Sequence, residues 1–169
     1  IELMLCRHGH EDQLHHESLV HLDKESNCFY PYLWNSSVNE YLIELGFKSV
    51  TEAISHKSYQ VSKDTQITYI ANALDSMIII ESGDKVILNI NDALPANHIN
   101  IINKFLFRIK KRWPEIDYLF CGYAGASHFP NTLHHESKND LEIAEAREQL
   151  FAHNFCHILN VLKPKTAIP

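Results

Sequence analysis

The chain has 169 residues, of which 45% are hydrophobic and 21% are charged, and this composition excludes a disordered or fibrous protein. Asp and Glu outnumber Lys and Arg by 21 to 15, so the net charge of −6 provides no overall basic field to attract nucleic acid or an anionic membrane. Residues 1–169 contain neither a signal-peptide pattern nor a long apolar span, and we expect a single cytoplasmic domain.

The four cysteines are widely separated and form no C-x-x-C pair, which excludes a zinc ribbon and a thioredoxin-like motif. Two of them lie inside apolar runs, so we expect reduced, buried thiols. The sequence starts without Met and ends in a segment, residues 165–169, that is predicted to enter a strand. We therefore expect a fragment of a longer polypeptide, with a fold that is incomplete at both ends.

The first part of the chain alternates between strand and helix patterns. A buried strand is predicted over residues 1–6, and leucines at helical spacing predict a short helix over residues 12–22. A second strand and its turn are expected over residues 27–34. The capping-box pattern Ser37-Val38-Asn39-Glu40 then predicts the start of a helix that Gly46 ends.

The rest of the chain predicts strands followed by a helix–strand–helix alternation. Residues 48–63 have a mixed pattern that is expected to give edge strands. Three β-type runs follow, over residues 66–70, 76–81 and 85–91. The last two are separated by the hairpin signal Ser82-Gly83-Asp84. Helix, strand and helix then follow over residues 96–113, 117–121 and 139–162, with the last helix starting at Asn139 or Asp140. This order implies an α/β fold in which helices cover sheet layers.

One stretch, His8-Gly9-His10-Glu11-Asp12-Gln13, lies where the first strand gives way to the first helix. Alternation along an extended backbone places His8 and His10 on the same side, and the following turn can bring Asp12 to the same cavity. Imidazole and carboxylate together are typical ligands of zinc, iron or manganese. The alternative is a polar turn in a chain that contains 12 histidines.

This stretch resembles the H-x-H-x-D-H motif of the metallo-β-lactamase superfamily, and Asn91-Asp92 resembles the later strand end that carries its metal-bridging aspartate. Within the superfamily, the chain is most similar to the lactamase-like part of CMP-N-acetylneuraminate hydroxylase and related bacterial proteins. Further similar segments cover residues 122–130, 145–150 and 162–165. The resemblance implies an α/β fold of four layers, an αββα sandwich.

The resemblance also implies a metal site and a reaction. His8 and His10 would ligate a first divalent ion, Asp12 would ligate a second, and Asp92 would bridge the two; zinc, iron or manganese is expected, as one or two ions. Such ions lower the pKa of a bound water, so that hydroxide can attack an ester, amide or phosphoester. Asp12, Asp92 and His128 are the implied catalytic residues, because a carboxylate ligand can take a proton and His128 lies in a loop expected to border the cavity.

The superfamily pattern is incomplete in this sequence. Gln13 stands where the last histidine of the motif is expected, and an amide is a poor ligand for a borderline metal. Residues 66–76 offer Asn72 and Asp75 where a third histidine is expected, and Tyr123 lies in a loop where many members have another histidine. A mononuclear site made by two imidazoles and one carboxylate, His8, His10 and Asp92, remains compatible with the sequence, with help from Asp12 or His128.

Two roles are open for Asp75, which could reach the metal cavity or simply cap the backbone of its turn. Three functions follow from these residues. The first is a metal-dependent hydrolase acting on a small molecule such as a nucleotide sugar or another phosphoester. The second is an oxygenase component that resembles CMP-sialic acid hydroxylase, and the third is a catalytically silent domain retained for binding or assembly. A partner chain or domain that completes the fold is expected in each case.

Overall fold

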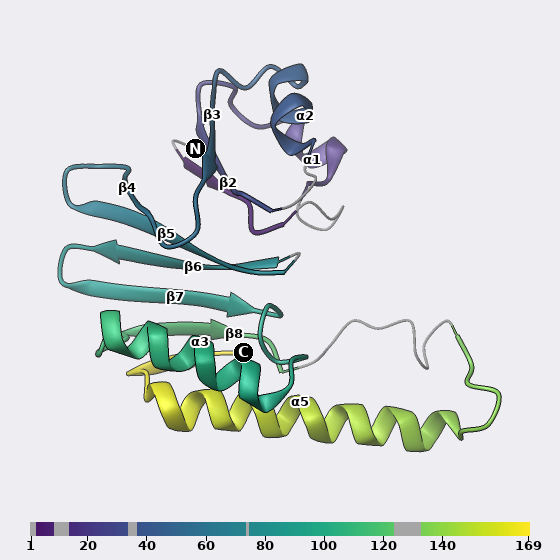
Figure 1. Ribbon diagram of the computed structural model, residues 1–169. Coiled ribbons are helices and arrows are strands. Elements are labelled where there is room, and N and C mark those ends of the chain that lie inside the picture. Colours follow the sequence, from purple (N-terminus) through teal and green to yellow (C-terminus); the bar gives the residue numbers. More distant parts are fainter. Residues whose placement is uncertain (1–2, 9–13, 34–36, 74, 124–132) are drawn as a thin grey trace. The chain divides into compact units, whose positions relative to one another are not determined.

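A computed structural model describes residues 3–8, 14–33, 37–73, 75–123 and 133–169 (Figure 1). The chain forms two compact units, Ile1–Asp84 and Lys85–Pro169, which we call unit 1 and unit 2 and describe separately. The expectation of one domain over residues 1–169 stays a prediction. None of the helices in the described ranges is long and apolar enough to cross a membrane.

Unit 1 begins with a parallel three-stranded sheet in the order β1-β2-β3. Its strands are β1 (Leu3–Leu5), β2 (Asn27–Pro31) and β3 (Ser49–Ala53). The strands predicted near residues 1–6 and 27–34 are confirmed. The segment expected to give edge strands supplies β3, which lies at the edge of this sheet next to β2.

Two short helices connect these strands, α1 (His16–Leu19) and α2 (Val38–Glu44). The helix predicted over residues 12–22 is thus reduced to a single turn. Helix α2 confirms the second prediction, and Gly46 ends it with a φ of +94°, which glycine adopts without strain. The prediction of a capping box is wrong, because the Ser37 side chain makes no cap hydrogen bond. Its backbone has φ −81° and ψ 17°, whereas a capping residue is usually extended.

An antiparallel sheet completes unit 1, with β4 (Ser58–Gln60), β5 (Thr65–Asn72) and β6 (Asp75–Ser82) paired in that order. Two apolar cores separate the layers. Cys28 and Tyr30 of β2 pack with α1 and α2, whereas Phe29, which alternates with them, packs with Ile67 and Tyr69 of β5. Unit 1 therefore has the layers helix, sheet and sheet, and its parallel sheet is covered on both faces.

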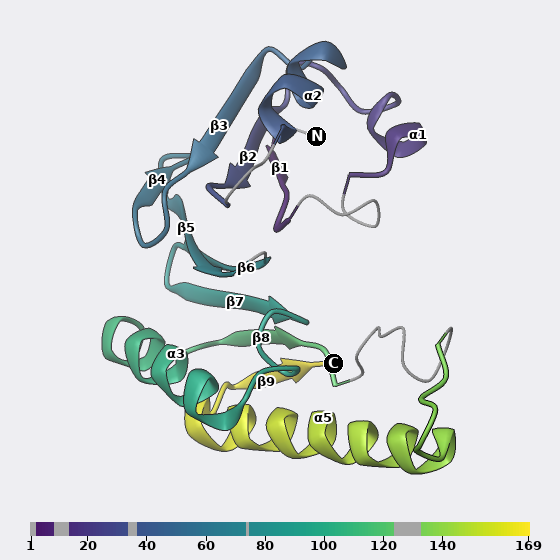
Figure 2. The same ribbon diagram turned by 45° about the vertical axis from the view of Figure 1, so that its right-hand side comes forward.

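Unit 2 is built around a second parallel sheet in the order β7-β8-β9 (Figure 2). Its elements are β7 (Lys85–Asn91), α3 (Ile99–Arg112), β8 (Tyr118–Cys121), α5 (Asp140–Leu162) and β9 (Thr166–Ile168). All of them follow the sequence prediction closely. Asn139 caps α5, because its side chain accepts a hydrogen bond from the Leu141 amide at 2.8 Å.

The four thiols are free, and three of them are buried as predicted for reduced cysteines. Burial raises the pKa of Cys6 and of Cys121 to about 12, and it raises the pKa of Cys28 to about 11. Cys156, on α5, is exposed.

Candidate metal site

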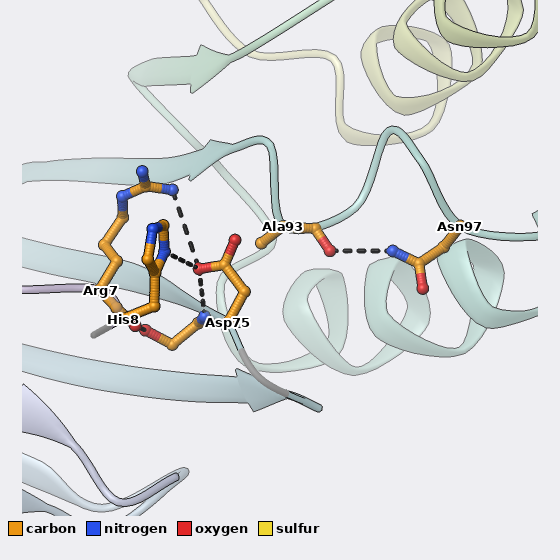
Figure 3. Close-up of polar contacts among 6 residues, drawn as sticks. Arg7, His8, Asp75, Ala93 and Asn97 are labelled. Atoms are coloured by element: carbon orange, nitrogen blue, oxygen red, sulfur yellow. Dashed lines mark hydrogen bonds and ion pairs between the residues drawn. The ribbon is translucent and has the colours of Figure 1, made fainter. Parts of the chain in front are cut away.

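His8 forms a buried pair with Asp75 in unit 1. The His8 side chain is only 3% exposed, and its Nδ1 lies 2.9 Å from Asp75 Oδ1 (Figure 3). The same oxygen accepts a hydrogen bond from the Ser76 amide at 2.6 Å. Asp75 therefore has the capping role considered for it from the sequence, and the same carboxylate holds the His8 imidazole. Its place in a metal cavity stays a prediction.

The ends of two strands bring this pair together. His8 follows β1 by three residues, and Asp75 is the first residue of β6, 67 positions later. The buried Ser76 hydroxyl links the start of β6 to the segment after β1, because it donates a hydrogen bond to the Arg7 carbonyl at 2.6 Å. The Arg7 backbone, next to His8, is therefore held in place, as the His8 ring is by Asp75.

The hydrogen bond to Asp75 determines which nitrogen of His8 can bind a metal. A carboxylate only accepts hydrogen bonds, so Nδ1 is the protonated nitrogen of the neutral ring. The lone pair then lies on Nε2, the nitrogen through which such a histidine ligates a metal ion. A carboxylate in this position fixes the orientation of the ring and makes the imidazole more basic, and therefore a stronger ligand for a metal ion.

Arg7 adds a positive charge to the same carboxylate. Its side chain is only 4% exposed, and Nη1 lies 4.0 Å from Asp75 Oδ1 (Figure 3). Burial of a guanidinium is costly unless anions or hydrogen-bond acceptors surround it, so Asp75 compensates part of this charge. Nothing in the sequence indicated this role, because Arg7 belongs to no motif and its partner is distant along the chain.

The other predicted residues of unit 1 lie outside the described ranges, namely His10 and Asp12, and so does Gln13. The same holds for His128 of unit 2. Within the ranges that the structure describes, no three His, Cys, Asp or Glu side chains form a cluster that could hold a metal ion. The assignment of these ligands stays a prediction.

Asp92 lies in unit 2, directly after β7, and its side chain is exposed. The strand end before it is distorted by a β-bulge between Asn89 and Asn91, and Asn91 has a φ of +45°. A non-glycine residue seldom adopts this backbone region, and such distortions occur often beside functional sites. The Gly122 amide donates to the Asn91 carbonyl at 2.8 Å, and a Cβ at Gly122 would lie 3.3 Å from that oxygen.

The turn after Asp92 is held by two buried or half-buried asparagines. Asn97 Nδ2 donates to the Ala93 carbonyl at 2.9 Å (Figure 3). Asn154 of α5, only 1% exposed, donates to the carbonyls of Pro95 and Asn97 at 2.7 and 3.0 Å. Asp92 thus begins a turn whose backbone is tied to a helix of the same unit.

No family model and no curated protein sequence matches the chain. Among solved structures, a variant of the β-hydroxylase CmlA matches with a TM-score of 0.72 and 16% identity, over 99% of this chain and 36% of that one. CmlA from Streptomyces venezuelae, described as a diiron β-hydroxylase, matches with a TM-score of 0.69 and 17% identity, over 99% and 35%. The fold is that of the metallo-β-lactamases.

A third structure supports the same fold. Zn²⁺-bound PqqB from Methylobacterium extorquens matches with a TM-score of 0.52 and 11% identity, over 72% of this chain and 46% of that one. The fold predicted from the motif of residues 8–13 is therefore confirmed. The chain spans about a third of CmlA and about half of PqqB, and at these identities the similarity concerns the fold alone.

Proposed function

We propose that the chain is a metal-dependent enzyme domain in which His8 ligates a divalent ion through Nε2. The observation that carries this proposal is the buried hydrogen bond between His8 Nδ1 and Asp75. An imidazole fixed by a carboxylate is the usual arrangement behind a metal-binding histidine. The residues proposed to complete the ion's ligands are His10 and Asp12 from the sequence motif and Asp92 from the later strand end.

The names of the structural neighbours support metal use. CmlA is described as a diiron protein and PqqB as zinc-bound. With two imidazoles, two carboxylates and Gln13 in place of a histidine, the donors are richer in oxygen than a typical structural zinc site. The mononuclear set of His8, His10 and Asp92 has the two histidines and one carboxylate that are typical of non-haem iron with open positions. We therefore propose iron as the preferred ion and zinc or manganese as alternatives.

Two reactions are compatible with such an ion. As a Lewis acid it would activate a water for hydrolysis of an ester, an amide or a phosphoester, with Asp12, Asp92 or His128 as proton acceptor. The alternative is an oxygenase component, which the β-hydroxylase name of CmlA and the resemblance to CMP-sialic acid hydroxylase favour. For both reactions we propose a small-molecule substrate, for example a nucleotide sugar.

Metal analysis tests the proposal directly. The purified chain should retain about one or two equivalents of iron, zinc or manganese after dialysis without chelator. His8→Ala should remove most of this metal, whereas His21→Ala, which changes an exposed histidine of the same unit, should leave the stoichiometry unchanged. Equal metal content in the two variants would contradict the role of His8.

Two further measurements separate the candidate functions. Gln13→His should raise the metal stoichiometry if the second position lacks only this ligand. The iron-loaded chain should consume oxygen with an added reductant if it is an oxygenase component, and the zinc-loaded chain should hydrolyse activated phosphodiesters if it is a hydrolase. A folded chain that binds no ion would instead support the catalytically silent domain.

A further inference from the structure

Helix α3 carries an unusual exposed surface in a chain whose net charge is −6. The helix has five basic residues and no acidic one. Lys104, Phe107, Arg108 and Lys111 lie at helical spacing on the side away from its buried residues, and we call them the basic surface. Phe107 is 70% exposed in the middle of these cations. A single exposed apolar side chain is common on protein surfaces, but Phe107 also lines an apolar groove, and contiguous exposed apolar area of this kind is suited to a partner.

An apolar groove of about 420 Å³ adjoins the basic surface, between α3 and the end of α5. Its lining includes Leu106, Phe107 and Val161. Lys110 contributes its stem to the wall, while its Nζ donates to the Val161 carbonyl at 2.6 Å. The groove thus offers apolar contact area, and the neighbouring Lys111 keeps its charge at the rim.

The first turns of α5 have the opposite character. All four buried residues of this fully described helix lie at or after Phe151, and none lies in residues 140–150. Figures 1 and 2 show these first turns extending past the start of α3. This segment has four acidic side chains and one basic. Leu141, Glu142, Glu145 and Glu148, which we call the acidic surface, are all exposed, and Leu141 is 65% exposed.

We propose that the basic surface of α3 binds the acidic surface of α5 from a second copy of this chain. The spacing matches, because Lys104, Arg108 and Lys111 repeat at i, i+4 and i+7, as do Leu141, Glu145 and Glu148. The lengths match as well, since residues 140–150 extend about 16 Å and α3 about 21 Å. Each copy carries both surfaces, so two identical contacts can close a two-fold dimer in which α3 of each copy meets α5 of the other.

The apolar side chains give this contact its affinity and the charges its specificity. Phe107 and the groove would receive Leu141, which removes two strongly exposed apolar side chains from water. The facing charges of opposite sign set the register and disfavour contacts between two basic or two acidic surfaces. An anionic membrane would suit the basic surface alone, but the four carboxylates of α5 in the same unit oppose that partner.

Charge reversal of either surface tests the dimer. The full chain is studied by sedimentation equilibrium, as wild type, as Lys104→Glu/Arg108→Glu/Lys111→Glu and as Glu142→Lys/Glu145→Lys/Glu148→Lys. The wild type should dimerise, and each triple variant should dissociate at least tenfold more readily. A mixture of the two variants restores opposite charges at both contacts, so it should form a 1:1 heterodimer with an affinity near that of the wild type.

The control is Lys63→Glu, an exposed charge reversal in unit 1, which should leave dimerisation unchanged. Circular dichroism establishes that each variant is folded, and the mixture distinguishes lost pairing from lost structure. A wild type that stays monomeric, or variants that do not recover on mixing, would overturn the proposal. Binding of the monomeric wild type to phosphatidylserine vesicles, lost in the α3 variant, would overturn it in favour of a membrane partner.

Discussion

Asp75 accepts hydrogen bonds from the His8 ring and from the Ser76 amide, and measurements of metal binding can show which of the two contacts matters more. If its main contribution is to hold His8, Asp75→Ala should lower the metal affinity about 10- to 100-fold, the effect typical of losing a carboxylate behind a ligating histidine. If its main contribution is the cap on Ser76, the variant should lose stability and bind metal normally. Titration with Fe²⁺ and Zn²⁺, with urea unfolding in parallel, separates the two. Glu44→Ala, an exposed carboxylate of unit 1, is the control.

The cysteines give a second prediction, because burial raises the pKa of three thiols to about 11 or 12. A thiol reacts as its thiolate, so at pH 8 these three should react slowly with Ellman's reagent. The exposed Cys156 should account for one rapid equivalent. Cys156→Ser should abolish that phase, and guanidinium should release the other three. Two or more rapid equivalents from the folded wild type would contradict the burial of Cys6, Cys28 and Cys121.

At the site, the sequence motif identifies candidate ligands whose roles stay predictions, whereas side chains that act through distant contacts carry no such signal. His8 stands out because it is followed by His10 and Asp12. Asp75 could be suspected, since it begins a strand after a turn, but its two roles could not be separated without the contact to His8. Arg7 has no sequence signal at all, because its burial depends on how β1 and β6 meet.

Asn154 connects α5 to the turn after β7 through two hydrogen bonds. Asn154 is buried and donates to two backbone carbonyls, so Asn154→Ala leaves both acceptors without this donor. We expect a loss of about 2–3 kcal/mol in the free energy of unfolding. Urea unfolding followed by circular dichroism measures this change. Asn160→Ala, at an exposed position of the same helix, should change the free energy little, and an equal loss in both variants would contradict the role assigned to Asn154.

Helices and strands could be predicted where the spacing of apolar residues or a capping residue marks them clearly. The prediction was less accurate where packing against distant residues determines the local backbone. The apolar spacing of α3, and Asn139 with Leu162 for α5, gave bounds within a few residues of the observed ones. The helix predicted after the histidine motif is shorter than expected, since only His16–Leu19 is helical in the described part of residues 12–22. Leu19 lies in this turn, whereas Leu14 reaches the same core from the segment before it. Ser37 failed as a capping side chain because its backbone is not extended.

The fold of the whole chain could be predicted from a few residues, because the same arrangement of sheets and helices is compatible with very different amino-acid sequences. The chain matches CmlA with a TM-score of 0.72 at only 16% identity. Such similarity requires apolar alternation, turn positions and strand order, and these survive substitution of most side chains. Function does not follow in the same way, since it depends on individual ligands, and the sequence departs from the superfamily pattern at Gln13.

Stability in acid should depend strongly on Asp117, which joins the three strands of unit 2. Asp117 lies just before β8, and its carboxylate accepts hydrogen bonds from the Val86 amide at 3.0 Å and from Lys165 Nζ at 2.8 Å. Its own carbonyl accepts from the Thr166 amide at 2.9 Å. The Lys165 ammonium and the Val86 amide lower the pKa of Asp117 from 3.8 to about 2.

The sign of the effect follows from proton binding. Since the folded chain holds this carboxylate ionised to a lower pH than the unfolded chain does, Asp117 stabilises the fold above its ordinary pKa of 3.8. That contribution should disappear as the pH falls from about 4 to about 2. The same pair raises the pKa of Lys165, so its contribution should also fade well above pH 10, when the amine deprotonates.

Urea unfolding at pH values from 7 to 2.5 measures this dependence. Asp117→Asn should be less stable than wild type at pH 7, and the difference should narrow below pH 4, because the wild-type carboxylate is then becoming protonated while the amide never titrates. Glu44→Gln should run parallel to wild type over the whole range, since Glu44 is exposed. A constant difference between Asp117→Asn and wild type down to pH 2.5 would mean that Asp117 acts through packing alone. A converging difference would identify the ionised Asp117 carboxylate, held by Lys165 and the Val86 amide, as a source of the acid sensitivity of unit 2.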